Sequence, residues 1–420
     1  MAPQSNLTYL LAQLCAPEAS IQPDSREISM NIPMSSPDLT EAEREAVAAV
    51  LRTPNLSLGG EILTFEAAFQ EYTGSQHAIG VSSGTAGLHI CVRTAGIQDG
   101  DLVITAPFSF VASANVLLYE RAVPVFVDVD PITGNIDPEQ AAQAITDLNQ
   151  GGKAARRWLP RKGANPGSLL KAILPVDVFG QPADMDALNA TARDAGLKVI
   201  EDACEALGAE YKGRKAGTLG ECGVFAFYPN KQITTGEGAV IVTDDDAAAR
   251  LMRALRNQGR APGDTWLQHT HLGYNYRLDE MSAALGRVQL SRIAELLDKR
   301  DRIAAWYGER LAEMPGVTPP QIAVTTTRTS WFVYVIRLET GLDRDKIARR
   351  LAEQGIPARP YFLPIHLQPY MVERFGYREG DYPVTEDLGR RGLALPFSGV
   401  MREEQVEYVC QVLRTTLQKF

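Results

Sequence analysis

One lysine, Lys231, stands in a turn between two segments with the composition of β-strands. Residues 222–228 before it are apolar and aromatic, and residues 239–243 after it are apolar, with a tight loop of threonine and glycine at 234–238 between. An amine held against such packing is partly shielded from water, which favours the neutral form that attacks an aldehyde. Lys231 is therefore a candidate Schiff-base nucleophile, but most lysines are exposed surface charges, so other residues must decide between the two interpretations.

A second candidate is Asp202, which ends a predicted buried strand at 198–202. In open α/β sheets, ligands bind beyond the carboxyl ends of the strands. A carboxylate at that edge can pair with the protonated ring nitrogen of pyridoxal phosphate and keep the ring an effective electron sink. Aspartate also caps helices, so this residue alone leaves both interpretations open.

Residues 81–89 have the pattern of a short strand, a turn of small residues and a helix. The first N–H groups of a helix have no partner within it, and the helix dipole favours negative charge at this end. Because Ser83, Gly84 and Thr85 are small, they leave space for a phosphate. We predict a phosphate site at this turn.

Two phenylalanines, Phe108 and Phe110, follow a predicted strand at 102–105. An aromatic ring in this place can stack on a flat heterocycle, whereas the more frequent role of phenylalanine is in the core. Along the chain, the segments thus supply a phosphate turn, a stacking ring, a partner for a ring nitrogen and a lysine. Their combination favours a site for pyridoxal phosphate.

From about Ile32 to the C-terminus, the chain resembles the sugar aminotransferases of the DegT/DnrJ/EryC1/StrS family, which are fold-type I enzymes that use pyridoxal phosphate. The most specific segments are SSGTAGLH, EDACEALGAEY, FAFYPNKQITTGEG, HLGYNYRLDEMSAALG and RPYFLPIHLQPY. The resemblance implies an α/β fold with a mostly parallel sheet in a large domain and a smaller C-terminal α/β domain.

The resemblance also assigns roles to residues of this sequence. It assigns Lys231 to the covalent attachment of the cofactor and Asp202 to the pyridine nitrogen. It assigns the phosphate to the turn with Gly84 and Thr85, and the face of the ring to Phe110.

Three further assignments concern the partner subunit and the substrate. Asn275, in the segment GYNYR, is expected to reach the cofactor phosphate of a neighbouring subunit, which implies a homodimer with shared active sites. Tyr361 and His366 are expected to contact the substrate. For His366, a hydrogen bond within a turn is the alternative.

The chain departs from the family pattern at three positions. Ala226 stands where many members have serine, and Ala239 replaces a glycine. Glu205 stands where most have glutamine or histidine, and a carboxylate near the phenolic oxygen of the cofactor is unfavourable unless it is protonated or shares a proton. Members that dehydrate sugars have histidine in place of the lysine, so the retained Lys231 disfavours a dehydratase.

We therefore expect an aminotransferase of polysaccharide or amino-sugar biosynthesis. By resemblance, the amino donor is glutamate and the acceptor a nucleotide-linked keto-sugar, specifically a 4-keto-6-deoxy sugar, because the sequence GTA at 84–86 resembles members that aminate carbon 4. An aminocyclitol aminotransferase that acts on a keto-inositol would share these residues. A regulator that binds the cofactor without catalysis is an alternative of another class, but it would need a DNA-binding module.

The composition is that of a chain with a large core, with 420 residues of which 45% are hydrophobic and 22% charged. The net charge of −9 argues against nucleic acid as a partner. The sequence has neither an apolar run of transmembrane length nor a basic and apolar N-terminal signal, so we expect no membrane partner. The odd number of scattered cysteines predicts no metal site and reduced thiols in the cytoplasm; they are Cys15, Cys91, Cys204, Cys222 and Cys410.

Predicted strands alternate with helical stretches, which indicates a mostly parallel sheet covered on both faces. We expect an N-terminal extension at 1–30, a large domain that binds pyridoxal phosphate at 31–290 and a small domain at 291–420. A basic insertion at 149–168 has five cations among glycines and prolines. It either attracts a nucleotide diphosphate or, as such runs usually are, is a solvated loop.

Overall fold

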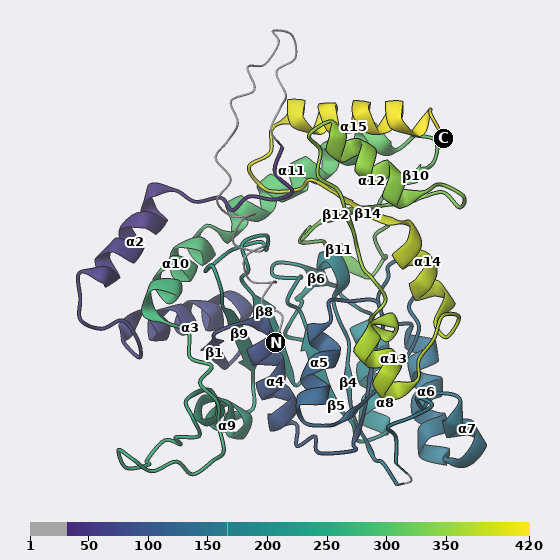
Figure 1. Ribbon diagram of the computed structural model, residues 1–420. Coiled ribbons are helices and arrows are strands. Elements are labelled where there is room, and N and C mark those ends of the chain that lie inside the picture. The colour runs from purple at the N-terminus through teal and green to yellow at the C-terminus, as the bar shows by residue number, and fades with distance from the viewer. Residues whose placement is uncertain (1–31, 166) are drawn as a thin grey trace, which may run out of the picture. The chain divides into compact units, whose positions relative to one another are not determined.

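The computed structural model describes residues 32–165 and 167–420 (Figure 1). Residues 31–420 form one compact unit. The expected extension at 1–30 lies outside the described residues, and the expected boundary at 290/291 stays a prediction. Within the described ranges, no helix combines the length and the apolar composition needed to cross a membrane.

The central sheet confirms the predicted parallel arrangement. Five of its strands are joined by parallel pairing, and β1 and β9 add an antiparallel edge. Their apolar runs are buried almost throughout, as expected for a sheet with both faces covered. The spatial order is β1 (His77–Val81), β9 (Ala239–Thr243), β8 (Cys222–Ala226), β5 (Lys198–Asp202), β4 (Leu170–Leu174), β2 (Leu102–Thr105) and β3 (Val123–Phe126).

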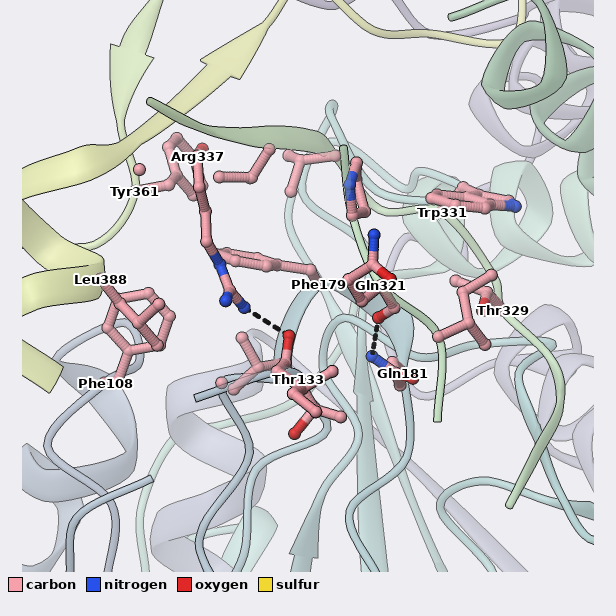
Figure 2. A pocket seen from close by; sticks show the side chains of 18 residues that line it. Phe108, Thr133, Phe179, Gln181, Gln321, Thr329, Trp331, Arg337, Tyr361 and Leu388 are labelled. Carbon is pink, nitrogen blue, oxygen red and sulfur yellow. Dashed lines mark hydrogen bonds between the residues drawn. The ribbon is translucent and has the colours of Figure 1, made fainter. Parts of the chain in front are cut away.

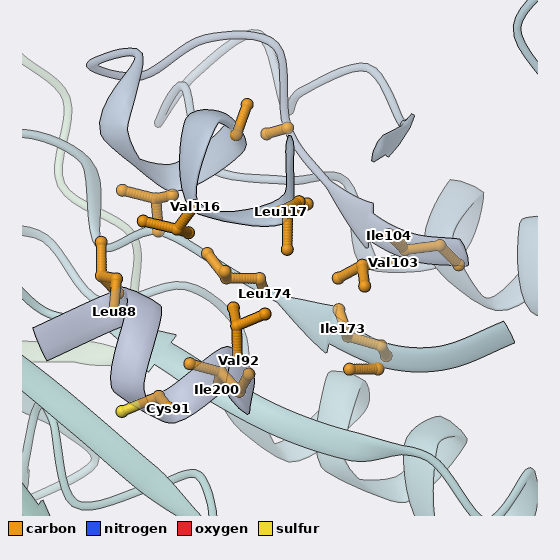
Figure 3. Packing of buried hydrophobic residues seen from close by; sticks show 14 of the residues in the cluster. Leu88, Cys91, Val92, Val103, Ile104, Val116, Leu117, Ile173, Leu174 and Ile200 are labelled. Atoms are coloured by element: carbon orange, nitrogen blue, oxygen red, sulfur yellow. The ribbon is translucent and has the colours of Figure 1, made fainter. Parts of the chain in front are cut away.

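Helices pack on both faces of this sheet, because successive strand residues point to opposite sides. On β8, Val224 lies in one hydrophobic cluster with Leu88 of α4 (Gly84–Thr94), whereas Phe225 lies in another with Phe65 of α3 (Gly60–Thr73). Figure 3 shows the first cluster, with Leu88 and its neighbours on α4 packed near Ile200 of β5. The remaining helices of residues 32–290 are α2 (Glu41–Leu51), α5 (Ala112–Tyr119), α6 (Pro138–Gln150), α7 (Gly152–Arg156), α8 (Met185–Asp194), α9 (Asp246–Arg256), α10 (Glu280–Ser291) and the 3-10 turn η1 (Val178–Gly180).

The C-terminal part of the chain has a second, antiparallel sheet in the order β10 (Val317–Thr318), β12 (Tyr334–Leu338), β14 (Gly392–Leu395) and β13 (Arg359–Pro360). A third sheet joins β11 (Thr326–Arg328) to β6 (Glu210–Tyr211) and β7 (Arg214–Lys215). Near the C-terminus, α15 packs against α11 and α12 (Figure 1). The helices of this part are α11 (Ile293–Leu311), α12 (Arg344–Glu353), η2 (Ile365–Leu367), α13 (Pro369–Phe375), α14 (Pro383–Arg391) and α15 (Glu403–Leu417).

Candidate active site

Asp202 lies at the carboxyl end of β5, in the middle of the sheet, with a residue exposure of 5%. Its Oδ1 accepts a hydrogen bond of 3.2 Å from the backbone N–H of Cys204. Burial raises the pKa of Asp202, and the bond from Cys204 and the positive charge of Lys231 oppose this effect. A buried carboxylate of this kind is stabilised by a protonated ring nitrogen placed beside it.

Lys231 lies in the turn after β8, where its backbone N–H donates to the carbonyl of Tyr228 at 2.9 Å. The side chain is only 12% exposed, and its Nζ lies 3.6 Å from Oε1 of Glu205. The ammonium also lies over the ring of Phe332, 3.8 Å from the centroid. The aromatic ring and the carboxylate thus hold the amine in one place while they shield it from water.

Glu205 connects the lysine to two further residues. Its Oε2 accepts a hydrogen bond of 3.0 Å from the backbone N–H of Phe179, which adopts a left-handed conformation with φ of 58°. Burial raises the pKa of Glu205, against the effect of the charge on Lys231. The predicted substrate residue Tyr361 lies near this centre, because its ring centroid is 6.1 Å from that of Phe179 and 6.4 Å from that of Phe332. Burial and the charge of Glu205 raise the pKa of Tyr361 to about 12.

The predicted phosphate turn contacts two segments of the centre, at Cys204 after β5 and at Ala226 on β8. Ser83 is the N-cap of α4, and its hydroxyl accepts the N–H of Ala86 at 3.1 Å. A Cβ on Gly84 would lie 2.9 Å from Cβ of Ala226 and 3.0 Å from Sγ of Cys204, so the helix begins directly against the two segments. The N–H groups of Gly84 and Thr85 belong to the first turn, where the helix itself supplies no acceptor.

These residues fit pyridoxal phosphate. A lysine amine, a buried carboxylate and a helix N-terminus are the groups that its aldehyde, ring nitrogen and phosphate need, and the fold brings them together. Within residues 32–165 and 167–420, there is no group of histidine, cysteine and acidic residues that could hold a metal ion.

The structure distinguishes Phe108 from Phe110, whose roles the sequence left open. Phe108 is buried at 2% exposure and packs edge-on against Phe179 and Phe362, so it belongs to the core. Phe110 is 63% exposed and follows β2 at the same sheet edge. Of the two rings, only Phe110 is free to cover a bound heterocycle.

Asn275 is exposed. Its neighbour Tyr276 accepts a hydrogen bond of 2.9 Å from the N–H of Ser82, and Val81 and Arg277 form an isolated antiparallel bridge. The segment with Asn275 therefore lies beside the phosphate turn of its own chain. That Asn275 reaches the phosphate of a partner subunit stays a prediction.

His366 lies in the interior. Its side chain in η2 is completely buried, with Nε2 3.0 Å from Oε1 of Glu386 and the ring edge-on to Tyr382. This bond joins η2 to α14, so it is not the hydrogen bond within a turn that was the alternative. That His366 contacts the substrate stays a prediction, which this burial does not support.

A cleft adjoins the centre (Figure 2). Phe179 and Tyr361 line it, whereas Lys231 and Asp202 do not. Arg337 donates hydrogen bonds to the carbonyls of Pro131 and Ile132 at its wall. Sequence reasoning missed this cleft and the ring of Phe332 over the lysine, because the residues come from distant segments without a local motif.

Comparisons with known proteins give one consistent family. Residues 37–414 match the model of the DegT/DnrJ/EryC1/StrS aminotransferase family. A GDP-perosamine synthase of Caulobacter vibrioides is 38% identical over 390 residues, which are 92% of this chain and 98% of that protein.

Solved structures agree with this match. A DegT DnrJ EryC1 StrS aminotransferase from Brucella abortus is 32% identical with a TM-score of 0.80, over 89% of this chain and 95% of the other. Helicobacter pylori PseC, an aminotransferase involved in the biosynthesis of pseudoaminic acid, is 28% identical with a TM-score of 0.82, over 93% of this chain and 100% of the other.

Proposed function

Because the chain belongs to the DegT/DnrJ/EryC1/StrS aminotransferase family and is a pyridoxal phosphate-dependent aminotransferase, we propose that it transfers an amino group from an amino acid to a nucleotide-linked keto-sugar. The observation that carries this proposal is the shielded Lys231 beside Glu205, close to the buried Asp202 and the N-terminus of α4. The proposed donor is glutamate, and the proposed acceptor is a 4-keto-6-deoxy sugar. The name of the Caulobacter relative makes a GDP-linked acceptor the first to test.

Each group of the centre has a proposed role. When bound, pyridoxal phosphate supplies an electron sink for the carbon that loses a proton. Lys231 would hold the cofactor through Nζ, and the same nitrogen would carry the α-proton of the amino donor. The carboxylate of Asp202 would accept a hydrogen bond from the pyridine N–H of the cofactor and so keep the proton on that nitrogen.

The surrounding residues are proposed to bind the phosphate of the cofactor and to orient its ring. The N–H groups of Gly84 and Thr85, with the hydroxyl of Ser83, bind the phosphate, and the ring of Phe110 covers one face of the heterocycle. Tyr361 is proposed to lie on the substrate side, as its place in the wall of the cleft supports.

Glu205 shares a proton with the lysine in this proposal. The two side chains are both largely buried, and their nearest charged atoms lie 3.6 Å apart. Burial raises the pKa of Glu205, so this carboxylate can hold a proton beside the lysine.

The proposed assembly is a homodimer in which Asn275 of each chain completes the phosphate site of the partner. The exposure of Asn275 leaves its side chain open to a partner chain, which supports this proposal. We also propose a cytoplasmic location, where the thiols of Cys91, Cys204, Cys222 and Cys410 stay reduced.

The test is a panel of keto-sugars carried by different nucleotides, including 3-keto and 4-keto compounds, each incubated with glutamate and the enzyme. Mass spectrometry should show the replacement of the keto oxygen by an amine in the 4-keto compounds, with 2-oxoglutarate formed in equal amount. The Lys231→Ala variant is the control for uncatalysed reaction. Amination of a keto-inositol, with none of the nucleotide sugars accepted, would refute the proposed substrate class in favour of an aminocyclitol aminotransferase.

A further inference from the structure

A histidine on α4 joins a chain of hydrogen bonds outside the reaction centre. The side chain of His89 is 5% exposed, with Nε2 2.8 Å from Oε1 of Glu120. Its Nδ1 lies 3.1 Å from the hydroxyl of Tyr276. Glu120 also accepts hydrogen bonds from Arg93 at 2.8 Å and from the hydroxyl of Tyr274 at 3.2 Å.

The chemistry of these partners defines the direction of each hydrogen bond. Burial tends to raise the pKa of Glu120, but the bonds from His89 and Arg93 hold it below its ordinary value, so the carboxylate is ionised and only accepts. Burial lowers the pKa of His89, which favours the neutral ring. Nε2–H therefore donates to Glu120, and Nδ1 accepts the hydroxyl proton of Tyr276.

Tyr276 is attached to both ends of the phosphate turn. Its carbonyl accepts the N–H of Ser82, the residue before the turn, at 2.9 Å. Its hydroxyl reaches His89, which follows the turn on α4. The turn with Ser83, Gly84 and Thr85 lies between these two attachments, so the position of Tyr276 affects how the N–H groups of the turn are aimed.

One further contact holds Tyr276, and another holds His89. Its ring stacks on the ring of Tyr274 with 4.9 Å between centroids and 11° between planes. The edge of the His89 ring also meets Tyr119, with centroids 5.2 Å apart. Because the tyrosine side chain is fixed by packing as well as by its hydroxyl, loss of the hydroxyl alone leaves the ring in place and changes only the attachment to α4.

We propose that His89 and Tyr276 are positioning residues, which hold the phosphate turn of this chain in the geometry that binds the phosphate of pyridoxal phosphate. This inference rests on the proposed role of Ser83, Gly84 and Thr85. It adds that the strength of phosphate binding depends on a hydrogen bond that touches neither the cofactor nor the substrate.

The test compares two ligands that differ only in the phosphate. Full-length protein freed of cofactor is titrated with pyridoxal phosphate and with pyridoxal, and binding is followed by tryptophan fluorescence. In Tyr276→Phe, we expect the affinity for pyridoxal phosphate to fall about five- to tenfold, and the affinity for pyridoxal to stay as in the wild type. Tyr408→Phe is the matched control, since this hydroxyl donates to the carbonyl of Gln354 at an exposed site.

A second variant makes the test independent of the first. His89→Gln can keep a donor toward Glu120, but it has no acceptor at the position of Nδ1 beside the hydroxyl of Tyr276, so it should give the same selective loss. Both changes remove the same hydrogen bond, the one between His89 and Tyr276. The double variant should therefore bind pyridoxal phosphate about as well as either single variant.

Three results would overturn the inference. In the first, both variants bind both ligands as the wild type does. In the second, both ligands lose the same affinity, and in the third, the losses of the two single variants add up in the double variant. Failure of the proposed phosphate site looks different, because wild-type protein would then bind pyridoxal phosphate no better than pyridoxal.

Discussion

Addition of one methyl group at Gly84 is the sharpest test of the phosphate turn. A Cβ at this position would lie 2.9 Å from Cβ of Ala226 and 3.0 Å from Sγ of Cys204. Ordinary contacts between such atoms are about 3.5–4.0 Å. The Gly84→Ala variant must therefore move the start of α4 away from Cys204, which follows β5, and from Ala226 on β8.

The chain offers a matched control at Gly60. Both glycines are the first residue of a helix, but a Cβ at Gly60 would meet no atom within 4 Å. Both changes to alanine gain the same helix propensity, up to about 1 kcal/mol. Crowding of a packed site costs about 1–3 kcal/mol, so we expect Gly84→Ala to be less stable than Gly60→Ala by about 2 kcal/mol.

The assay has two parts. Urea denaturation of the cofactor-free protein gives the difference in stability, and fluorescence titration gives the dissociation constant of pyridoxal phosphate. We expect Gly84→Ala to bind the cofactor at least about tenfold more weakly than the wild type, because loss of about 1.4 kcal/mol of phosphate binding has this effect. Gly60→Ala should bind it normally.

A double variant tests whether contact with Ala226 causes the weaker cofactor binding of Gly84→Ala. Ala226→Gly removes the nearest atom to the added methyl group, so Gly84→Ala with Ala226→Gly should recover part of the lost affinity. The reasoning is refuted if Gly84→Ala behaves like Gly60→Ala in both measurements, or if the two changes at 84 and 226 are simply additive.

The remaining predictions concern Lys231, Asp202, Asn275 and His366. Lys231→Ala should lose the visible absorbance of bound pyridoxal phosphate and all turnover but still bind pyridoxamine phosphate; turnover in this variant would exclude the lysine as the attachment site. Asp202→Ala should fold yet slow the first half-reaction by orders of magnitude in stopped-flow absorbance, whereas a small change would make it a helix cap. When inactive Lys231→Ala chains are mixed with inactive Asn275→Ala chains, verified heterodimers should regain activity because one site of each is intact, and none would appear if each site came from a single chain. Because burial lowers the pKa of His366, the stability that its neutral ring gives above pH of about 6.5 should be lost as the pH falls, and His366→Gln should flatten that limb of a urea-denaturation series; an unchanged slope would contradict this.

The sequence by itself predicted the architecture and the cofactor. Strands with continuous apolar runs alternate with helical stretches, which is a local pattern, and it indicates a parallel sheet before any contact is known. The resemblance and the residue types around Lys231 and Asp202 also indicated the chemistry, because the motifs that bind pyridoxal phosphate are short and each follows a strand end.

Only the tertiary structure decided how individual side chains are used. Phe108 and Phe110 have the same chemistry and lie two residues apart, yet one is core and the other exposed. His366 stands in a segment of the family pattern, but packing buries it against Glu386. The approach of Phe332 to Lys231 joins residues about a hundred positions apart. Burial and such contacts depend on how segments far apart in the sequence pack together, and a local sequence pattern does not show which segments will meet.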